Sequence, residues 1–171
     1  MLILGVDPGL AIVGWGVVEY AGNKFNTVAY GAITTPAGID VEMRILQIYD
    51  GLDAIIKKYK PTDMAIEELF FNTNQKTAIA VAEARGAILL CGMKNNVPMF
   101  EYTPLQVKQA VVGYGRADKK QVIAMTNMIL ELKKTPKLDD TSDALAIAIC
   151  HAHTGGSVMK DYYNEKKKKL L

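Results

Sequence analysis

LILGVDPG, at residues 2–9, opens the chain with a short apolar run that ends in Asp7. A run of this length and composition predicts a buried strand over residues 2–7. A second apolar run, at residues 64–66, ends in Glu67, and Glu68 follows directly. Carboxylates at the ends of buried strands lose hydration and repel one another unless a cation compensates them. The two runs therefore predict two strands that end at a cation site.

The rest of the pattern predicts an α/β fold around these two strands. Apolar segments at residues 12–20 and 25–33 are separated by a short turn, so the first three strands should pair antiparallel. Asp40 is placed to cap a helix with a 3.6-residue apolar period. The expected elements after that helix are a strand at 62–67, a helix at 75–94, a strand at 97–102, and helices at 104–112, 118–132 and 140–153. Together they predict a mixed five-stranded sheet with helices on both faces.

Two further acids stand at the head of the last predicted helix. Asp140 and Asp143 are three residues apart, so they share one helix face. If the first and fourth strands are parallel neighbours, Asp7 and Glu67 emerge at adjacent carboxyl ends, where α/β proteins bind ligands. Four carboxylates can then converge. Hard cations such as Mg²⁺ bind carboxylates together with substrate phosphate oxygens, so the pattern predicts phosphodiester chemistry.

Length and charge limit the alternatives. The chain has 171 residues, enough for a single domain, which we expect at residues 1–154, followed by a flexible basic tail at 155–171. The net charge is +2, but residues 160–171 carry five Lys and two acids, which leaves 15 basic and 16 acidic groups elsewhere. Nucleic-acid contact by the body must therefore come from local clusters of positive charge, and the Lys run at 166–169 can add weak, sequence-independent attraction to DNA.

The sequence also predicts where the protein resides. No apolar stretch is long enough to span a bilayer, and no basic segment precedes residues 1–4, which argues against a membrane anchor or signal peptide. Cys91 and Cys150 lie in apolar helical contexts without CxxC spacing. Buried, reduced thiols of this kind are typical of a cytoplasmic protein.

Several motifs together resemble those of one known family. They are LGVDPG at residues 4–9, AIEELF at 65–70, FEY at 100–102, QVKQ at 106–109, VVG at 111–113 and DTSDALA at 140–146. Each alone is weak, but in this order and spacing, over residues 2–153, the chain resembles the RuvC-type Holliday-junction resolvases of the retroviral integrase and ribonuclease H superfold. The resemblance implies a crossover junction endodeoxyribonuclease of DNA recombination and repair. It also implies a homodimer that nicks two opposed strands of a four-way DNA junction symmetrically, with a branch-migration helicase complex as partner.

The resemblance further implies that Asp7, Glu67, Asp140 and Asp143 are the catalytic, metal-binding acids. In a two-metal mechanism, cations about 4 Å apart flank the scissile phosphate, one activating a water and the other stabilising the departing 3′ oxygen. We expect two Mg²⁺ ions per site, replaceable by Mn²⁺, with Asp7 as the bridging ligand. Strand alternation puts Glu67 and Glu68 on opposite faces, so only one should ligate metal. The resemblance selects Glu67, and the residues alone do not.

A cluster of basic residues surrounds a glycine-containing turn at residues 113–116. Arg116, Lys119 and Lys120, with Lys108 one helix earlier, can neutralise DNA phosphates. By composition, a solvated helix face explains them equally well. The resemblance implies functional roles for Lys108 and Lys119, one of which can also stabilise charge at the reacting phosphate.

Two adjacent aromatics follow the fourth strand. An aromatic in this loop can stack on an unpaired base or wedge a base step, although adjacent aromatics are more often core residues. The resemblance assigns base contact to Phe70, and we expect Phe71 to pack inside.

The two histidines and the Ala-rich helix have less specific interpretations. His151 lies eleven residues after Asp140, about 16 Å along a helix, so neither His151 nor His153 should join the acids. We expect both at the surface near the helix end. The small residues of the helix at 75–94 permit close packing on its own sheet or, as we favour, a two-fold interface.

Two other functions fit parts of the pattern. Residues 5–9 with Gly14 are also similar to the phosphate loop of actin-like ATPases, but that architecture needs two such domains, which 171 residues cannot hold. A catalytically silent junction- or RNA-binding relative of the same fold is the remaining alternative. Four retained acids argue against it.

Overall fold

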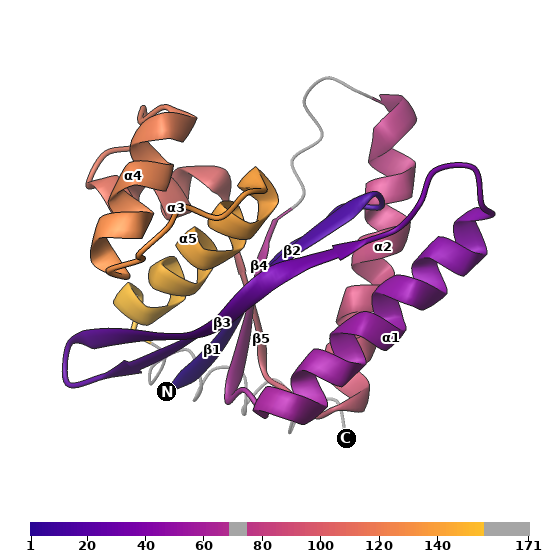
Figure 1. The fold of residues 1–171 in the computed structure, drawn as a ribbon, viewed down its shortest axis with the longest axis horizontal. Coiled ribbons are helices and arrows are strands. Elements are labelled where there is room, and N and C mark those ends of the chain that lie inside the picture. Colours follow the sequence, from indigo (N-terminus) through magenta and orange to yellow (C-terminus); the bar gives the residue numbers. More distant parts are fainter. Residues whose placement is uncertain (69–74, 156–171) are drawn as a thin grey trace, which may run out of the picture.

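The computed structural model describes residues 1–68 and 75–155, which form one mixed sheet with helices on both of its faces (Figure 1). Phe70, Phe71 and the Lys run at 166–169 lie outside the described residues, so their expected roles stay predictions. The elements, in chain order, are β1 (Leu2–Asp7), β2 (Ile12–Ala21), β3 (Lys24–Thr34), α1 (Val41–Tyr59), β4 (Asp63–Glu67), α2 (Gln75–Lys94), β5 (Met99–Tyr102), α3 (Pro104–Val112), α4 (Lys119–Ile129) and α5 (Asp139–His153).

The sheet has the strand order β3-β2-β1-β4-β5. The first three strands pair antiparallel, and β4 and β5 join parallel to β1, which confirms the predicted mixed sheet. In this register Val6 lies opposite Ile66, and Asp7 lies opposite Gly14. The carboxyl ends of β1 and β4 are therefore neighbours, which meets the condition under which Asp7 and Glu67 were expected to lie close together.

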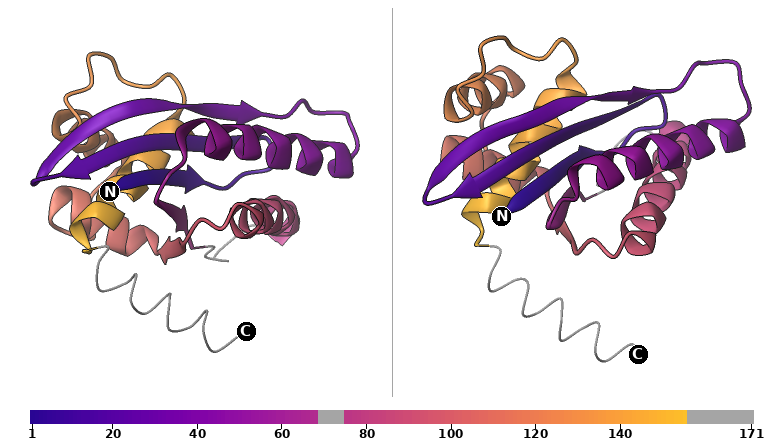
Figure 2. Two further views of the ribbon diagram at one scale, coloured as in Figure 1. Left: turned by 90° about the horizontal axis from the view of Figure 1, so that it is seen from below. Right: turned by 60° about the horizontal axis from the view of Figure 1, so that its bottom comes forward.

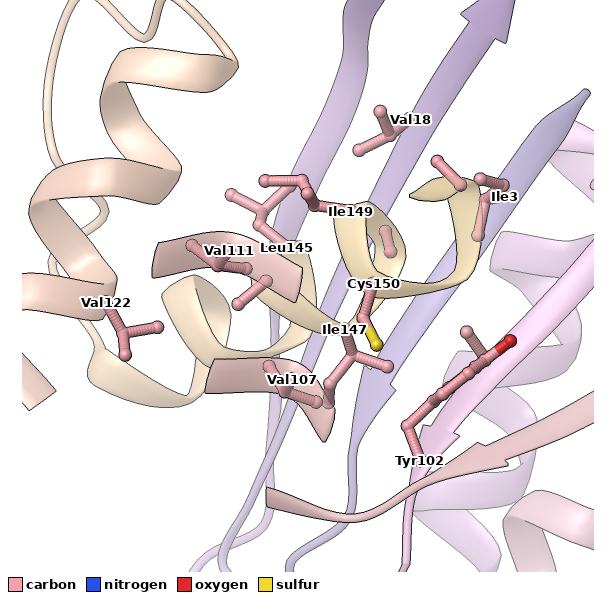
Figure 3. Packing of buried hydrophobic residues seen from close by; sticks show 14 of the residues in the cluster. Ile3, Val18, Tyr102, Val107, Val111, Val122, Leu145, Ile147, Ile149 and Cys150 are labelled. Atoms are coloured by element: carbon pink, nitrogen blue, oxygen red, sulfur yellow. The ribbon is translucent and has the colours of Figure 1, made fainter. Parts of the chain in front are cut away.

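Helices cover both faces of the sheet (Figures 1 and 2), and alternate side chains of the central strands enter two separate cores, one on each face. On one face, Ile3 of β1 and Ala65 of β4 pack in a cluster with α5, which is covered in turn by α3 and α4 (Figure 3). On the other face, Leu4 and Ile66 pack against α1 and α2. Alternation along a strand sends successive side chains to opposite faces, so adjacent residues belong to different cores.

Local sequence signals fix the helix ends that flank the site. Thr103 with Gln106 and Asp118 with Gln121 form complete capping boxes at the starts of α3 and α4. Asp40 occupies the cap position of α1 but makes no side-chain cap hydrogen bond, contrary to our expectation. No helix in the described part of the chain is long and apolar enough to cross a membrane.

Some predicted boundaries were too generous. β5 begins at Met99 rather than at residue 97, because the Val97 amide still donates to Gly92 O at the end of α2. α4 ends at Ile129 rather than at residue 132. Leu130 turns into the core there, and Glu131 takes a positive φ of 49°, which a helix cannot continue.

Candidate active site

Strand alternation brings Asp7 and Glu67 to the same face of the sheet. Asp7 is two residues from Gly5, and Glu67 is two residues from Ala65, and both of those residues contact the α5 side. Glu68 follows the end of β4, and its amide donates a 2.8 Å hydrogen bond to Tyr102 O. Glu67 is therefore the acid of this pair that faces α5, a distinction that the residues alone left open.

Helix α5 supplies the other two acids. Its first turns carry Asp140 and Asp143, both half-buried, above the ends of β1 and β4. The start of the helix is tied to β3, because Thr141 Oγ1 donates to Gly31 O over 3.1 Å. Acids from β1, β4 and α5 thus lie around one point at the carboxyl ends of the inner strands.

Burial and mutual repulsion perturb these carboxylates strongly. Burial, and then the charges of Glu67, Asp143 and Asp140, raise the pKa of Asp7 to about 8. Burial and the charge of Asp143 raise the pKa of Glu67, although a hydrogen bond to Asp7 opposes the rise. Burial also raises the pKa of Asp143, against the influence of Lys119. The cluster therefore holds more negative charge than its own surroundings compensate.

Lys119 is the cation nearest to this cluster. Its Nζ lies 3.1 Å from Asp143 Oδ2 and 3.3 Å from Asp139 Oδ2. Lys119 and Lys108 also line a pocket of about 230 Å³ together with Glu67 and Asp143. The pocket places basic groups of α3 and α4 beside the acids of β4 and α5. Asp139, the first residue of α5, is a second partner of Lys119.

The remaining predicted DNA contacts lie farther out. Arg116, in the turn between α3 and α4, and Lys120, in the first turn of α4, are exposed, and neither lines the pocket. Phe70 belongs to the segment 69–74, which the structure does not describe.

The donor set suits a hard divalent cation, although the side chains do not enclose one in their present positions. All four acids offer oxygen ligands, the kind that Mg²⁺ prefers. In residues 1–68 and 75–155, no three acidic, His or Cys side chains stand close enough to hold an ion as they lie. Asp143 is engaged by Lys119 instead. The oxygen ligands of these residues fit a metal ion. The ion pair between Lys119 and Asp143 shows that positive charge is already bound at the cluster.

Our prediction for His151 was wrong. His151 is completely buried, its Nδ1 lies 2.7 Å from Tyr102 Oη, and its ring centroid lies 4.6 Å from that of Phe100. Because α5 runs through the middle of the core, its last turn is still inside the protein (Figure 3). The apolar neighbours Ile149, Cys150 and Ala152 were the available signal. His153 is exposed, as expected, with Nδ1 3.1 Å from Ala110 O.

Acids that meet at the ends of two parallel strands and a covering helix, on a sheet of this order, define a nuclease of the ribonuclease H-like class. The family model described as crossover junction endodeoxyribonuclease RuvC matches residues 3–151. A relative of that name from Clostridioides difficile is 57% identical over 154 residues, covering 90% of this chain and 91% of the relative. Another, from Alkaliphilus oremlandii, is 59% identical over 155 residues, covering 91% and 94%.

A solved structure agrees with the sequence relatives. T. thermophilus RuvC in complex with a Holliday junction substrate superposes with a TM-score of 0.86 at 35% identity, covering 90% of this chain and 94% of that one. The chain belongs to the RuvC family of crossover junction endodeoxyribonucleases. The resemblance seen in the sequence is thereby confirmed, and so is the ribonuclease H-like fold.

Proposed function

We propose that this chain resolves four-way DNA junctions by cutting opposed strands at symmetric positions, and that residues 1–154 form the nuclease domain. The observation that carries the proposal is the gathering of Asp7, Glu67 and Asp143 at one sheet edge, with pKa values raised by burial and mutual repulsion. The family relationship to a protein solved with a Holliday junction supplies the substrate class. A silent binding relative is the disfavoured alternative, because it needs no such repulsive cluster.

The acids are the residues that would hold metal. Asp7, Glu67, Asp140 and Asp143 are the ligands we assign, with two Mg²⁺ ions per site and Mn²⁺ as a substitute. A bound divalent cation lowers the pKa of a water and stabilises charge on the phosphate. Lys119 pairs with Oδ2 of Asp143, so a cation held by Asp143 would compete with this ammonium group for the carboxylate. Asp139 would remain a partner for Lys119, which would keep its positive charge beside the acids.

Basic residues around the pocket would hold the DNA backbone. Lys108 and Lys119 line the pocket, which supports phosphate contact close to the reaction. Arg116 and Lys120 are exposed outside the pocket and would contact phosphates farther away. By the family resemblance we also assign base contact to Phe70.

Cuts in two opposed strands require two sites, so we propose a homodimer. Leu90 and Met93 of α2 are 56% and 52% exposed, and Ile79 is 69% exposed, which is unusual for large apolar side chains of a monomer surface when they lie together. Between them, α1 and α2 form a shallow groove lined largely by apolar residues, including Leu46, Gly86 and Leu90. A second copy is the occupant we assign to this face.

We expect Leu90→Lys to shift the protein toward monomer in analytical ultracentrifugation, with Lys94→Glu as a control that changes charge at the helix end.

The cellular setting follows from the same reasoning. Cys91 and Cys150 are both buried and unpaired, as in proteins of a reducing compartment, so we place the chain in the cytoplasm. A branch-migration helicase complex is the partner that the family resemblance implies.

The test is cleavage of a synthetic mobile four-way junction with Mg²⁺, with linear duplex as the control. We expect paired nicks in opposed strands that DNA ligase can seal, and no cutting of the duplex. Tight junction binding without metal-dependent cleavage would instead establish the silent binding relative.

A further inference from the structure

Gly14 of β2 lies directly beside the site and leaves no room for a side chain. It is paired with Asp7 in the β1–β2 ladder. A Cβ atom at Gly14 would stand 1.9 Å from Asp140 O, 2.3 Å from Asp140 C and 2.9 Å from Thr141 N. All three are backbone atoms of the first turn of α5. No rotamer change relieves such a contact, so the helix itself would have to move.

The same approach recurs one turn farther along α5. A Cβ at Gly5 would stand 2.0 Å from Ala144 O, again a backbone atom. At Gly16 the nearest atom is Leu145 Cδ2, at 2.5 Å, which is the end of a flexible side chain. Helix α5 therefore rests on the sheet through main-chain contacts at two glycines, and the first of these contacts is at Asp140.

We infer that Gly14 is a positioning residue, which sets the height of the start of α5 above β1 and hence the separation of Asp7 from Asp140 and Asp143. This inference rests on the proposed metal-dependent function. Real Cβ atoms essentially never come within 3.0 Å of such neighbours, so a methyl group at Gly14 would displace the helix start by about 1 Å. The displacement would carry both acids of α5 away from both acids of the strands.

Comparing two cations separates a widened metal site from a simple loss of stability. Mg²⁺ requires near-octahedral ligands at about 2.0–2.1 Å, whereas Ca²⁺ accepts flexible geometry at about 2.3–2.6 Å. A widened site should therefore lose Mg²⁺ affinity more than Ca²⁺ affinity. Partial unfolding would instead lower both affinities by the same factor.

The experiment is calorimetric titration of the full chain, without DNA, with Mg²⁺ and separately with Ca²⁺. We expect Gly14→Ala to weaken Mg²⁺ binding about 10–100-fold and Ca²⁺ binding clearly less. Gly16→Ala, on the same strand, is the matched control and should leave the ratio of the two affinities within about twofold, because only Leu145 has to move. An unchanged ratio in Gly14→Ala would overturn the inference.

A second variant keeps the test decisive if Gly14→Ala does not fold. Gly5→Ala displaces α5 at Ala144, one turn after Asp140 and directly after Asp143, so its Mg²⁺-to-Ca²⁺ affinity ratio should fall in the same direction. A folded Gly5→Ala with the wild-type ratio would count against the inference. A wild type that binds both ions and cuts junctions, alongside an unchanged ratio in the variants, would leave the proposed function intact. A wild type that binds neither ion would overturn the inference, and one that also fails to cut junctions would overturn the proposed function as well.

Discussion

The helices on the two faces of the sheet pack against the strands in different ways. On the α1 and α2 face, large aliphatic side chains such as Leu4, Ile48 and Leu52 are fully buried. On the α5 face, Gly5 and Gly14 let the helix backbone touch the strands. Both faces bury apolar side chains, but only the α5 face also brings ionisable groups close together. Substitutions on the α1 and α2 face should therefore affect stability without affecting the chemistry of the site.

The largest effect should come from the acid at the centre of the α5 face. We expect Asp7→Asn to lower junction cleavage by about 10³-fold or more, because it removes the ligand placed between the other three acids. Junction binding should remain, since the basic residues are unchanged. Cleavage and gel-shift assays on the same junction would measure both quantities. A variant that still cuts at more than a tenth of the wild-type rate would place the reacting centre elsewhere.

A truncation on the opposite face should affect stability alone. Leu52→Ala removes a completely buried side chain, and we expect the free energy of unfolding to fall by about 2–5 kcal/mol. The metal affinity of the remaining folded protein should not change. Urea unfolding and metal titration would measure the two quantities, with Met43→Ala, at a 50% exposed position of the same helix, as the control. Loss of metal affinity in folded Leu52→Ala would show that the faces are coupled.

The raised pKa of Asp7 predicts a pH dependence with a definite sign. Its pKa is about 8 in the folded protein and 3.8 as the unperturbed value, so the folded state binds the extra proton between these pH values. Metal-free wild type should therefore lose stability as the pH rises from about 4 to 8. Asp7→Asn removes this penalty and should be more stable by several kcal/mol at pH 8, with little difference near pH 4.

Thermal unfolding in EDTA across this pH range would measure the difference. Added Mg²⁺ should reduce it, because a cation stabilises the ionised acids of the wild type. Equal melting temperatures for the two proteins at pH 8 would mean that burial and repulsion do not raise the pKa of Asp7.

The smallest effect should distinguish the two neighbouring lysines of α4. Lys119 pairs with Asp143 and lines the pocket, whereas Lys120 does neither. If each contacts one phosphate, Lys119→Gln and Lys120→Gln should each lower the salt slope of junction binding by about one. Only Lys119→Gln should also reduce the rate of cleavage at saturating junction. A matching reduction in Lys120→Gln would remove the distinction between them.

Much of this arrangement could be predicted because it follows local rules. Apolar runs and short turns were enough for the strands and for the antiparallel pairing of the first three, whereas the parallel pairing of β1 with β4 entered only as a condition. The spacing of Asp140 and Asp143 was enough to place them on one helix face. These features depend on residues near one another in the chain.

The parts that escaped prediction depend on tertiary contacts. Alternation separates Glu67 from Glu68, but only the packing of α5 shows which face holds the site. His151 is buried because α5 is the central helix; its apolar neighbours in the sequence were the signal, but a histidine near a helix end was expected at the surface. Likewise the ion pair of Lys119 with Asp139 joins two helices that the sequence does not place side by side.

Glu67 and Glu68 offer the sharpest comparison of the two sides of the sheet, because the residues are adjacent and identical. The variants Glu67→Gln and Glu68→Gln remove the same charge one position apart. Calorimetric titration with Mg²⁺ measures the effect of each substitution on metal affinity. If the α5 face alone holds the cation, Glu67→Gln should weaken Mg²⁺ binding about tenfold or more, and Glu68→Gln should stay within about twofold of the wild type. Equal losses in the two variants, or a larger loss in Glu68→Gln, would contradict the assignment of the site to this face.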